Sequence, residues 1–188
     1  DLEQRGQFVA DGIGVTCPLI TMKGVAVGEL SKRRASDVKV YGVDERFWKF
    51  NGVSESTPLQ NGEALVSESL ASELGNGPGE SLLLRLEKPS DIPVESLHGR
   101  KEDPGKTIRL KVARVLRATD SLGEFLLQPQ QDAVRAVFVS LSFLQKQLEQ
   151  EERVNTILVS RSPSGQPQSI AALLKNKATL DDLGVKLR

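Results

Sequence analysis

The residues with the most obvious chemical potential lie between Gly99 and Thr107, where the chain reads Gly-Arg-Lys-Glu-Asp-Pro-Gly-Lys-Thr and ends like a phosphate-binding loop. Five residues rather than four separate Gly99 from Gly105. Glu102 and Asp103 would place carboxylates against phosphate oxygens, and Thr107 opens a strand pattern instead of the helix whose N-terminus should face the phosphates. A polar turn is therefore the better interpretation.

The other reactive side chains do not form a recognisable catalytic set. His98 is the only histidine and lies in a Pro-flanked loop, where no partner for general base catalysis is suggested nearby. Cys17 fits a small buried apolar residue better than a nucleophile. Asp44 and Glu45 could serve a hydrolase, but neighbours on a strand point opposite ways, which makes paired acid and base work awkward. We predict no catalytic residue, no cofactor-binding residue and no metal ligand.

Four further clusters have structural interpretations. The stretch from Thr179 to Asp182 has the spacing of a helix cap, and Trp48, beside Phe47, fits a core position. The basic run from Lys32 to Arg34 is too short for a nucleic-acid patch, and the acidic stretch from Glu149 to Glu152 is typical of a solvated helix end.

Composition narrows the class of protein. The 188 residues include 25 basic and 25 acidic side chains, so the net positive field that drives binding to nucleic acid is missing and nucleic acid is not an expected partner. The single cysteine cannot form an internal disulfide. No apolar run approaches the roughly 18 residues of a membrane helix, and the chain opens on Asp1 without a signal segment. We expect a piece of a larger protein.

The chain repeats one design, a β-rich run followed by a serine and a helical pattern, at 64–71 and 137–144. Ser67 and Ser140 are each predicted to cap the helix that follows them. Gly75 is expected to end the first of these helices in a left-handed conformation.

Alternation of apolar and polar residues predicts the remaining elements. At 37–43, Val38 and Val40 should face a core while Lys39 and Tyr41 face away. The pattern also predicts a short helix or turn at 44–48 and a strand at 107–112 with one apolar face. Antiparallel strands are expected at 115–116 and 125–127, joined by a turn at 120–123. A buried strand at 154–159 and a last helix over 170–174 follow. The fold class is α+β. A first lobe is expected from 1–85 and 133–188, interrupted by a β-rich insertion at 86–132.

The ordered set of these motifs resembles the extracytoplasmic core domain of MacB/FtsX-type ABC transporter permeases. The resemblance covers nearly the whole chain, although each motif alone is loose. It rests on Arg34-Ala35, Val38, Val40, Gly42-Val43-Asp44, Arg46-Phe47-Trp48, the run from Gly62 to Ala71, Gly79-Glu80, Val112 to Leu116, Val137 to Leu148, and Arg153 to Val159.

The resemblance implies a domain looped out between two transmembrane helices of the permease, on the periplasmic face of the bacterial inner membrane. It implies a porter-like lobe of β-α-β units and an inserted, mostly β lobe called sabre. It also implies a non-catalytic mechanotransmitter, with the flanking transmembrane helices, a separate ATP-binding subunit or domain, and a periplasmic adaptor or second permease copy as partners. The polar loop at 88–104 departs from the best-known members, so no binding residues are carried over. The alternative is a soluble extracytoplasmic binding or adaptor module without membrane helices.

Overall fold

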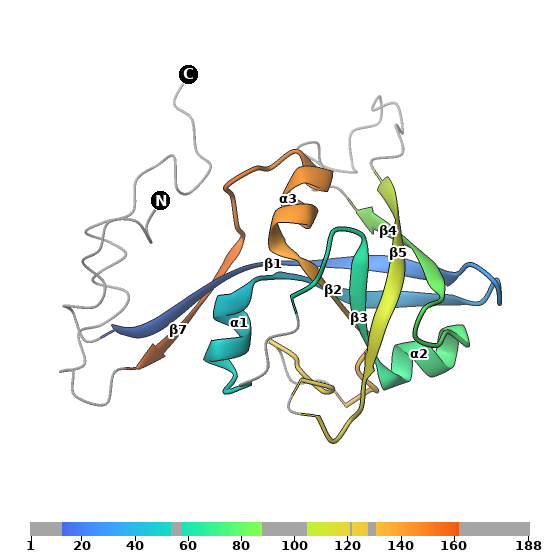
Figure 1. The fold of residues 1–188 in the computed structure, drawn as a ribbon, viewed down its shortest axis with the longest axis horizontal. Coiled ribbons are helices and arrows are strands. Elements are labelled where there is room, and N and C mark those ends of the chain that lie inside the picture. The colour runs from blue at the N-terminus through green and yellow to red at the C-terminus, as the bar shows by residue number, and fades with distance from the viewer. Residues whose placement is uncertain (1–12, 54–57, 88–104, 121, 128–130, 162–188) are drawn as a thin grey trace, which may run out of the picture. The chain divides into compact units, whose positions relative to one another are not determined.

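The computed structural model describes residues 13–53, 58–87, 105–120, 122–127 and 131–161 (Figure 1). Contacts divide the chain into two compact units. One contains Asp1–Cys17 and Ile157–Arg188, and the other contains Pro18–Thr156. In the described ranges, strands outnumber helices and the sheet mixes parallel and antiparallel pairs, as an α+β fold does.

The described elements follow one another in mixed order. They are β1 (Ile13–Gly28), β2 (Arg34–Val43), α1 (Glu45–Phe50), β3 (Glu63–Ser67), α2 (Glu68–Leu74), β4 (Ser81–Glu87), β5 (Gly105–Leu116), β6 (Ala136–Ser140), α3 (Leu141–Leu148) and β7 (Thr156–Arg161).

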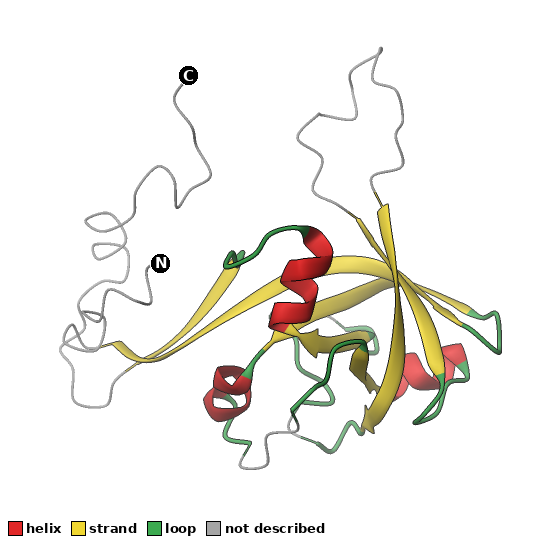
Figure 2. Cartoon of the chain, turned by 45° about the horizontal axis from the view of Figure 1, so that its top comes forward, coloured by secondary structure: helices red, strands yellow, loops and turns green. Residues whose placement is uncertain are grey.

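Six strands of the larger unit close on themselves into a barrel. The strand order is β2-β6-β3-β5-β4-β1, and β1 pairs again with β2. The long strand β1 can serve both neighbours because residues 20–27 pair with β2 while residues 24–28 also pair with β4. Gly24 lies at the start of a register shift in the β1–β2 pairing, where a Cβ would meet the Arg85 carbonyl oxygen at 2.8 Å. A side chain at Gly24 would therefore push β4 away from β1. Figure 2 shows the curled strands in a second view.

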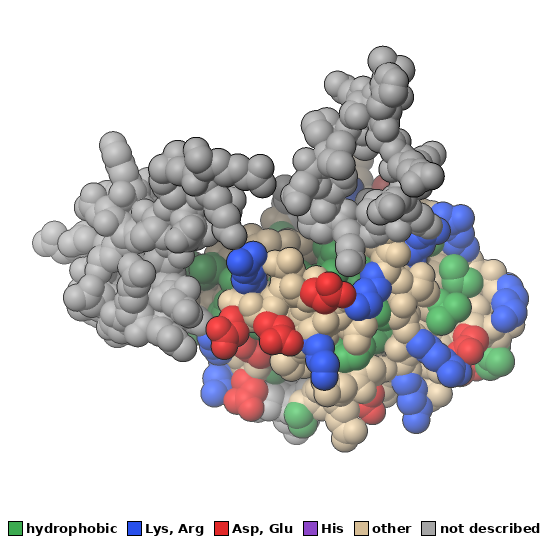
Figure 3. Space-filling model, turned by 90° about the horizontal axis from the view of Figure 1, so that it is seen from above, with side chains coloured by type: hydrophobic (Ala, Val, Ile, Leu, Met, Phe, Trp, Pro, Cys, Tyr) green, Lys and Arg blue, Asp and Glu red, His purple; other side chains and the backbone are tan. Residues whose placement is uncertain are grey.

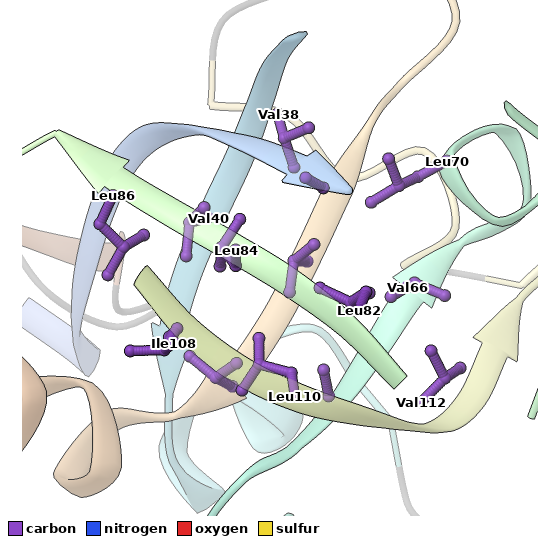
Figure 4. Packing of buried hydrophobic residues seen from close by; sticks show 14 of the residues in the cluster. Val38, Val40, Val66, Leu70, Leu82, Leu84, Leu86, Ile108, Leu110 and Val112 are labelled. Atoms are coloured by element: carbon purple, nitrogen blue, oxygen red, sulfur yellow. The ribbon is translucent and has the colours of Figure 1, made fainter. Parts of the chain in front are cut away.

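The barrel interior is aliphatic. Leu82, Leu84 and Leu86 of β4 are fully buried, and β5 alternates buried residues with exposed ones as the sequence predicted for 107–112. Figure 4 shows these side chains converging with others from the surrounding strands and from α2, namely Val38, Val40, Val66, Leu70, Ile108, Leu110 and Val112. Burial of this apolar surface is the main force that holds the strands together.

The predicted strand and helix repeat is confirmed, with one correction. Segment β3 leads into α2 and β6 leads into α3, and Gly75 ends α2 with φ 65° as expected. The Ser67 side chain caps α2 by accepting from Leu70 N at 3.4 Å. Ser140 makes no such cap bond, because its hydroxyl pairs with that of Ser142 at 3.0 Å instead.

Tyr41 corrects the predicted face of the 37–43 strand. Its side chain is only 2% exposed, because the outer side of β2 is covered by an aromatic cluster of Tyr41, Phe47, Phe125 and Phe138. The cluster also explains why 125–127 is not the predicted strand. Phe125 follows a series of turns and packs edge-on against Tyr41 and Phe47 rather than extending beside β5.

The predicted buried strand at 154–159 is present as β7 but begins at Thr156 and is not buried. Ile157 is 41% exposed. In the strand order of the described sheet, β7 lies at the end, beside β1, and an edge strand receives less cover. The helix predicted over 170–174 lies outside the described residues.

The division into lobes stays a prediction. Residues 105–116 of the predicted insertion form β5, which lies between β3 and β4 in the same sheet. Residues 88–104 of that insertion lie outside the described part of the chain.

Candidate functional site

The residues singled out for chemistry are not brought together by the described structure. Gly105 and Thr107 both lie in β5, so the segment that resembled a phosphate-binding loop ends in a strand, as the sequence analysis argued. Residues 99–104, His98 and the stretch from Thr179 to Asp182 lie outside the described residues. The described ranges contain no group of three His, Cys, Asp or Glu side chains placed to hold a metal ion.

Cys17 and Trp48 belong to the interior, as predicted. Cys17 is fully buried on β1, and Trp48 is 5% exposed with its ring edge-on to Phe47 at a centroid separation of 5.4 Å. Each contributes packing, and neither offers a surface to a ligand.

Asp44 and Glu45 have separate roles at the start of α1. Asp44 caps the helix by accepting from Arg46 N at 2.9 Å, and it also pairs with the Arg46 guanidinium. Glu45 is 80% exposed and lies near Lys49. A carboxylate fixed as a cap and a solvated carboxylate do not make an acid and base pair.

The two charged runs are exposed, as expected. The basic run from Lys32 to Arg34 covers the end of the turn between β1 and β2 and the first residue of β2, and residues 149–152 follow α3. Glu149 ends that helix with φ 57°, a left-handed conformation usually given to glycine.

The feature the structure does single out is the pairing between the two ends of the described chain. In the smaller unit, the Val15 amide on β1 donates to the Ser160 hydroxyl on β7 at 2.7 Å. In the larger unit, the Thr21 amide donates to Asn155 Oδ1 at 2.9 Å, and Asn155 Nδ2 donates to the Thr21 carbonyl at 2.7 Å. Strands β1 and β7 are neighbours in the strand order of the sheet. We call this pair of segments, Ile13–Thr21 and Asn155–Arg161, the ribbon.

Asn155 is a residue that sequence reasoning missed. Its side-chain amide bonds to both the N–H and the carbonyl of Thr21. In a regular sheet, the backbone of a neighbouring strand would make these two hydrogen bonds. The available signal was a polar Asn near the start of the predicted strand at 154–159, and β7 begins at Thr156, two residues after the predicted start. The connection from α3 supports it, since Gln145 Nε2 donates to the Arg153 carbonyl at 2.8 Å.

Electrostatics on the outer surface of the barrel tie neighbouring elements together. Asp37 forms ion pairs with Lys23 and Lys39, each at 3.0 Å, and these hydrogen bonds lower the pKa of Asp37. Arg135, at the entry to β6, pairs with Glu73 of α2, and this hydrogen bond raises the pKa of Arg135. Burial raises the pKa of Tyr41, so the phenol stays neutral. None of the helices in the described ranges is long and apolar enough to cross a membrane.

Comparison with known proteins identifies solved structures with a similar fold. No family model and no curated protein matches the sequence. Among solved structures, the periplasmic region of MacB from Actinobacillus actinomycetemcomitans is similar with a TM-score of 0.50 and 13% identity, over 87% of this chain and 64% of that one. This chain thus spans less than two thirds of that MacB region.

Two more solved structures match at least as broadly. The extracellular domain of the noncanonic ABC-type transporter YknZ from Gram-positive bacteria gives a TM-score of 0.51 and 10% identity over 99% of this chain and 84% of that one. A domain of a protein described as a permease, from Porphyromonas gingivalis, gives a TM-score of 0.51 and 15% identity, over 93% of this chain and 69% of that one. The resemblance drawn from the sequence is confirmed at the level of the fold: the chain folds like the extracytoplasmic domains of ABC transporter permeases.

Proposed function

We propose that this chain is the extracytoplasmic domain of an ABC transporter permease and that it transmits ATP-driven movement of the membrane part to work done outside the membrane. The observation that carries the proposal is the shared fold, which extends over 87 to 99% of the chain in the three comparisons. The domain itself is non-catalytic in this proposal and lies on the outer face of the bacterial inner membrane.

The ribbon is the element suited to carry the movement. Two hydrogen-bonded strands resist bending better than two separate linkers. Strand β1 then continues into the barrel, where its residues 20–28 pair with β2 and β4. A displacement applied to β1 therefore reaches two barrel strands through backbone hydrogen bonds rather than through side chains alone.

The partners follow from the proposal. The flanking transmembrane helices of the same permease would move the ribbon, and a separate ATP-binding subunit or domain would supply the energy. A periplasmic adaptor or a second permease copy would receive the work. Export is the expected form of that work.

The test uses the full-length protein with its ATP-binding partner in lipid nanodiscs. In a Cys17→Ala background, Val15→Cys with Ser160→Cys staples the ribbon, because these residues are in hydrogen-bond contact. If the two strands shift against each other during turnover, oxidation lowers the ATPase rate and a reductant restores it. The matched control is Lys23→Cys with Lys39→Cys, which staples directly opposite positions of β1 and β2 on the outer surface of the barrel and leaves the rate unchanged.

Two results would contradict the proposal. If neither disulfide changes the ATPase rate, the ribbon has no role in coupling. A full-length gene product without membrane segments and without an ATP-binding partner would favour a soluble binding or adaptor module.

A further inference from the structure

The outer side of the barrel carries arginines in a fixed arrangement across four strands. Strand pairing places Arg34 of β2 opposite Val27 of β1, Val27 opposite Leu83 of β4, and Leu83 opposite Arg109 of β5. Directly paired residues point to the same side of a sheet. These four residues, which we call the cationic row, therefore form one line with two aliphatic side chains between two guanidinium groups.

Burial shows that the cationic row faces outward. The neighbours Ala26, Leu82, Leu84 and Leu110 are buried in the barrel, whereas Arg34 is exposed and the Arg109 side chain is 66% exposed. Adjacent strands lie about 4.8 Å apart, so the row is about 14 Å long. Helix α2 contacts β2, β3 and β5, and helix α3 contacts β2 and β6.

The charge of this side is positive although the chain as a whole is neutral. Arg85 faces outward on β4, two residues along from Leu83, and Lys111 faces outward on β5, two residues along from Arg109. Glu29 pairs with Arg109 at 2.8 Å, and Glu63 lies opposite Lys111. Among the described side chains named here, four are basic and two are acidic.

The turn between β1 and β2 adds an apolar projection at the end of the cationic row. Leu30 is 74% exposed, the highest value among the large hydrophobic side chains of the described residues. The turn is held rigid, since Gly28 N donates to the Arg33 carbonyl at 2.9 Å and Lys32 N donates to the Gly28 carbonyl at 3.0 Å. Ser31 also donates to the Leu74 carbonyl at the end of α2. In Figure 3, basic side chains stand beside hydrophobic ones at the right-hand end, where Figure 1 places this turn.

We propose that the cationic row and the Leu30 turn form a docking face for an anionic lipid surface. Arginines recognise phosphate groups, and their aliphatic stems can lie along Val27 and Leu83 while the charged ends reach the headgroups. A projecting leucine suits a bilayer interface because headgroups and acyl chains rearrange around it, whereas a protein partner would need a matching pocket. The surface is convex, as the outside of a barrel must be, and that also fits a deformable partner.

The arrangement predicts weak, reversible adsorption. Each Lys or Arg near an anionic membrane raises the partition coefficient about fivefold, and burying one leucine side chain adds about tenfold. The expected partition coefficient is on the order of 10³ to 10⁴ M⁻¹, and it falls as salt is added. This property does not depend on the chain being part of a permease, so its failure would leave the proposed function standing.

The test measures co-sedimentation of the 188-residue chain with vesicles of phosphatidylcholine containing about 30% phosphatidylglycerol, a composition chosen to mimic an anionic leaflet. Arg34→Gln with Arg109→Gln should weaken binding about 25-fold, and Arg34→Lys with Arg109→Lys should restore most of it. Leu30→Ser should weaken binding about tenfold. The matched control, Lys49→Gln with Lys146→Gln, removes the same charge from α1 and α3 and should change binding by less than about twofold.

Three outcomes would overturn the proposal. The first is equal sedimentation of the wild-type chain with anionic and with pure phosphatidylcholine vesicles. The second is an equal loss of binding in the control and row variants, which would indicate a net-charge effect. The third is vesicle binding unchanged by Leu30→Ser together with tight binding to soluble poly-L-glutamate, which would point to an acidic protein partner.

Discussion

At the scale of single residues, Ser67 joins three parts of the larger unit through one hydroxyl. The side chain is fully buried, donates to the Val134 carbonyl at 2.6 Å and accepts from Ala136 N at 3.0 Å. It also accepts from Leu70 N as the cap of α2. A hydroxyl that satisfies backbone groups on two segments 67 residues apart fixes β6 beside the end of β3.

We expect Ser67→Ala to lower the free energy of unfolding by about 1 to 3 kcal/mol, because the substitution leaves buried backbone groups without partners and removes a helix cap. Ser140→Ala is the matched control at the equivalent place in the repeat. The Ser140 side chain makes no cap bond and pairs with the exposed hydroxyl of Ser142, so the effect of the substitution should stay within about 0.5 kcal/mol. Urea unfolding of both variants measures the difference, and equal losses would show that Ser67 has no special role.

The same pair of serines shows where sequence reasoning succeeds and where it stops. A serine after a β-rich run predicts a cap from local chemistry, and at Ser67 that prediction is confirmed. In both repeats a second serine follows two residues on, Ser69 and Ser142, so the local pattern does not distinguish the two sites. The Ser140 hydroxyl pairs with that of Ser142, whereas the Ser67 hydroxyl bonds the distant backbone at Val134 and Ala136. Tyr41 was misplaced for a different reason, because the aromatic cluster that covers it comes from residues distant in the sequence.

At the scale of elements, the ribbon depends on Asn155. Its side-chain amide links Thr21 to the segment that enters β7. It replaces the backbone hydrogen bonds of a paired strand just before the first residue of β7. Sequence periodicity predicted β7 but not its partner, since pairing with β1 joins positions 134 residues apart.

We predict that Asn155→Ala loosens the start of the ribbon. Loss of two hydrogen bonds should lower the stability of this segment by about 0.5 to 1.5 kcal/mol, which accelerates hydrogen exchange at the Thr21 amide about two- to tenfold. Asn155→Asp should lie between, because its carboxylate can still accept from Thr21 N but cannot donate to the Thr21 carbonyl. Gln150→Ala, on the same connection, is the control, and an equal acceleration there would contradict a specific role for Asn155.

At the scale of the whole larger unit, closure of the barrel makes its strands interdependent. Strand β1 completes the hydrogen bonding of both β2 and β4, which would otherwise be the edges of an open sheet. The alternation of β5 and the bulk of the core could be predicted from local patterns. Closure of the barrel could not be predicted in this way. It depends on the close approach of β4 to Gly24 and on a β1 strand long enough to pair with both β2 and β4.

We expect the slowest amides of all six barrel strands to exchange with one common free energy, because no barrel strand can open without exposing the shared core. Amides of β7, which is half-buried at the end of the described sheet, should exchange faster. Hydrogen exchange followed by NMR measures both groups. If the amides of residues 20–28 exchange with a free energy of opening several kcal/mol lower than that of the β5 amides, β1 opens separately from the rest of the barrel.

Closure also changes how copies of this unit meet one another. A sheet that ends in exposed strands offers a row of unsatisfied amides and carbonyls that templates stacking with its neighbours. Here β2 and β4 have those groups occupied by β1, so crowded copies of the unit lack that template along the barrel wall. The sixteen residues of β1 thus remove two such edges from the barrel wall, which lowers the tendency of copies to pair there.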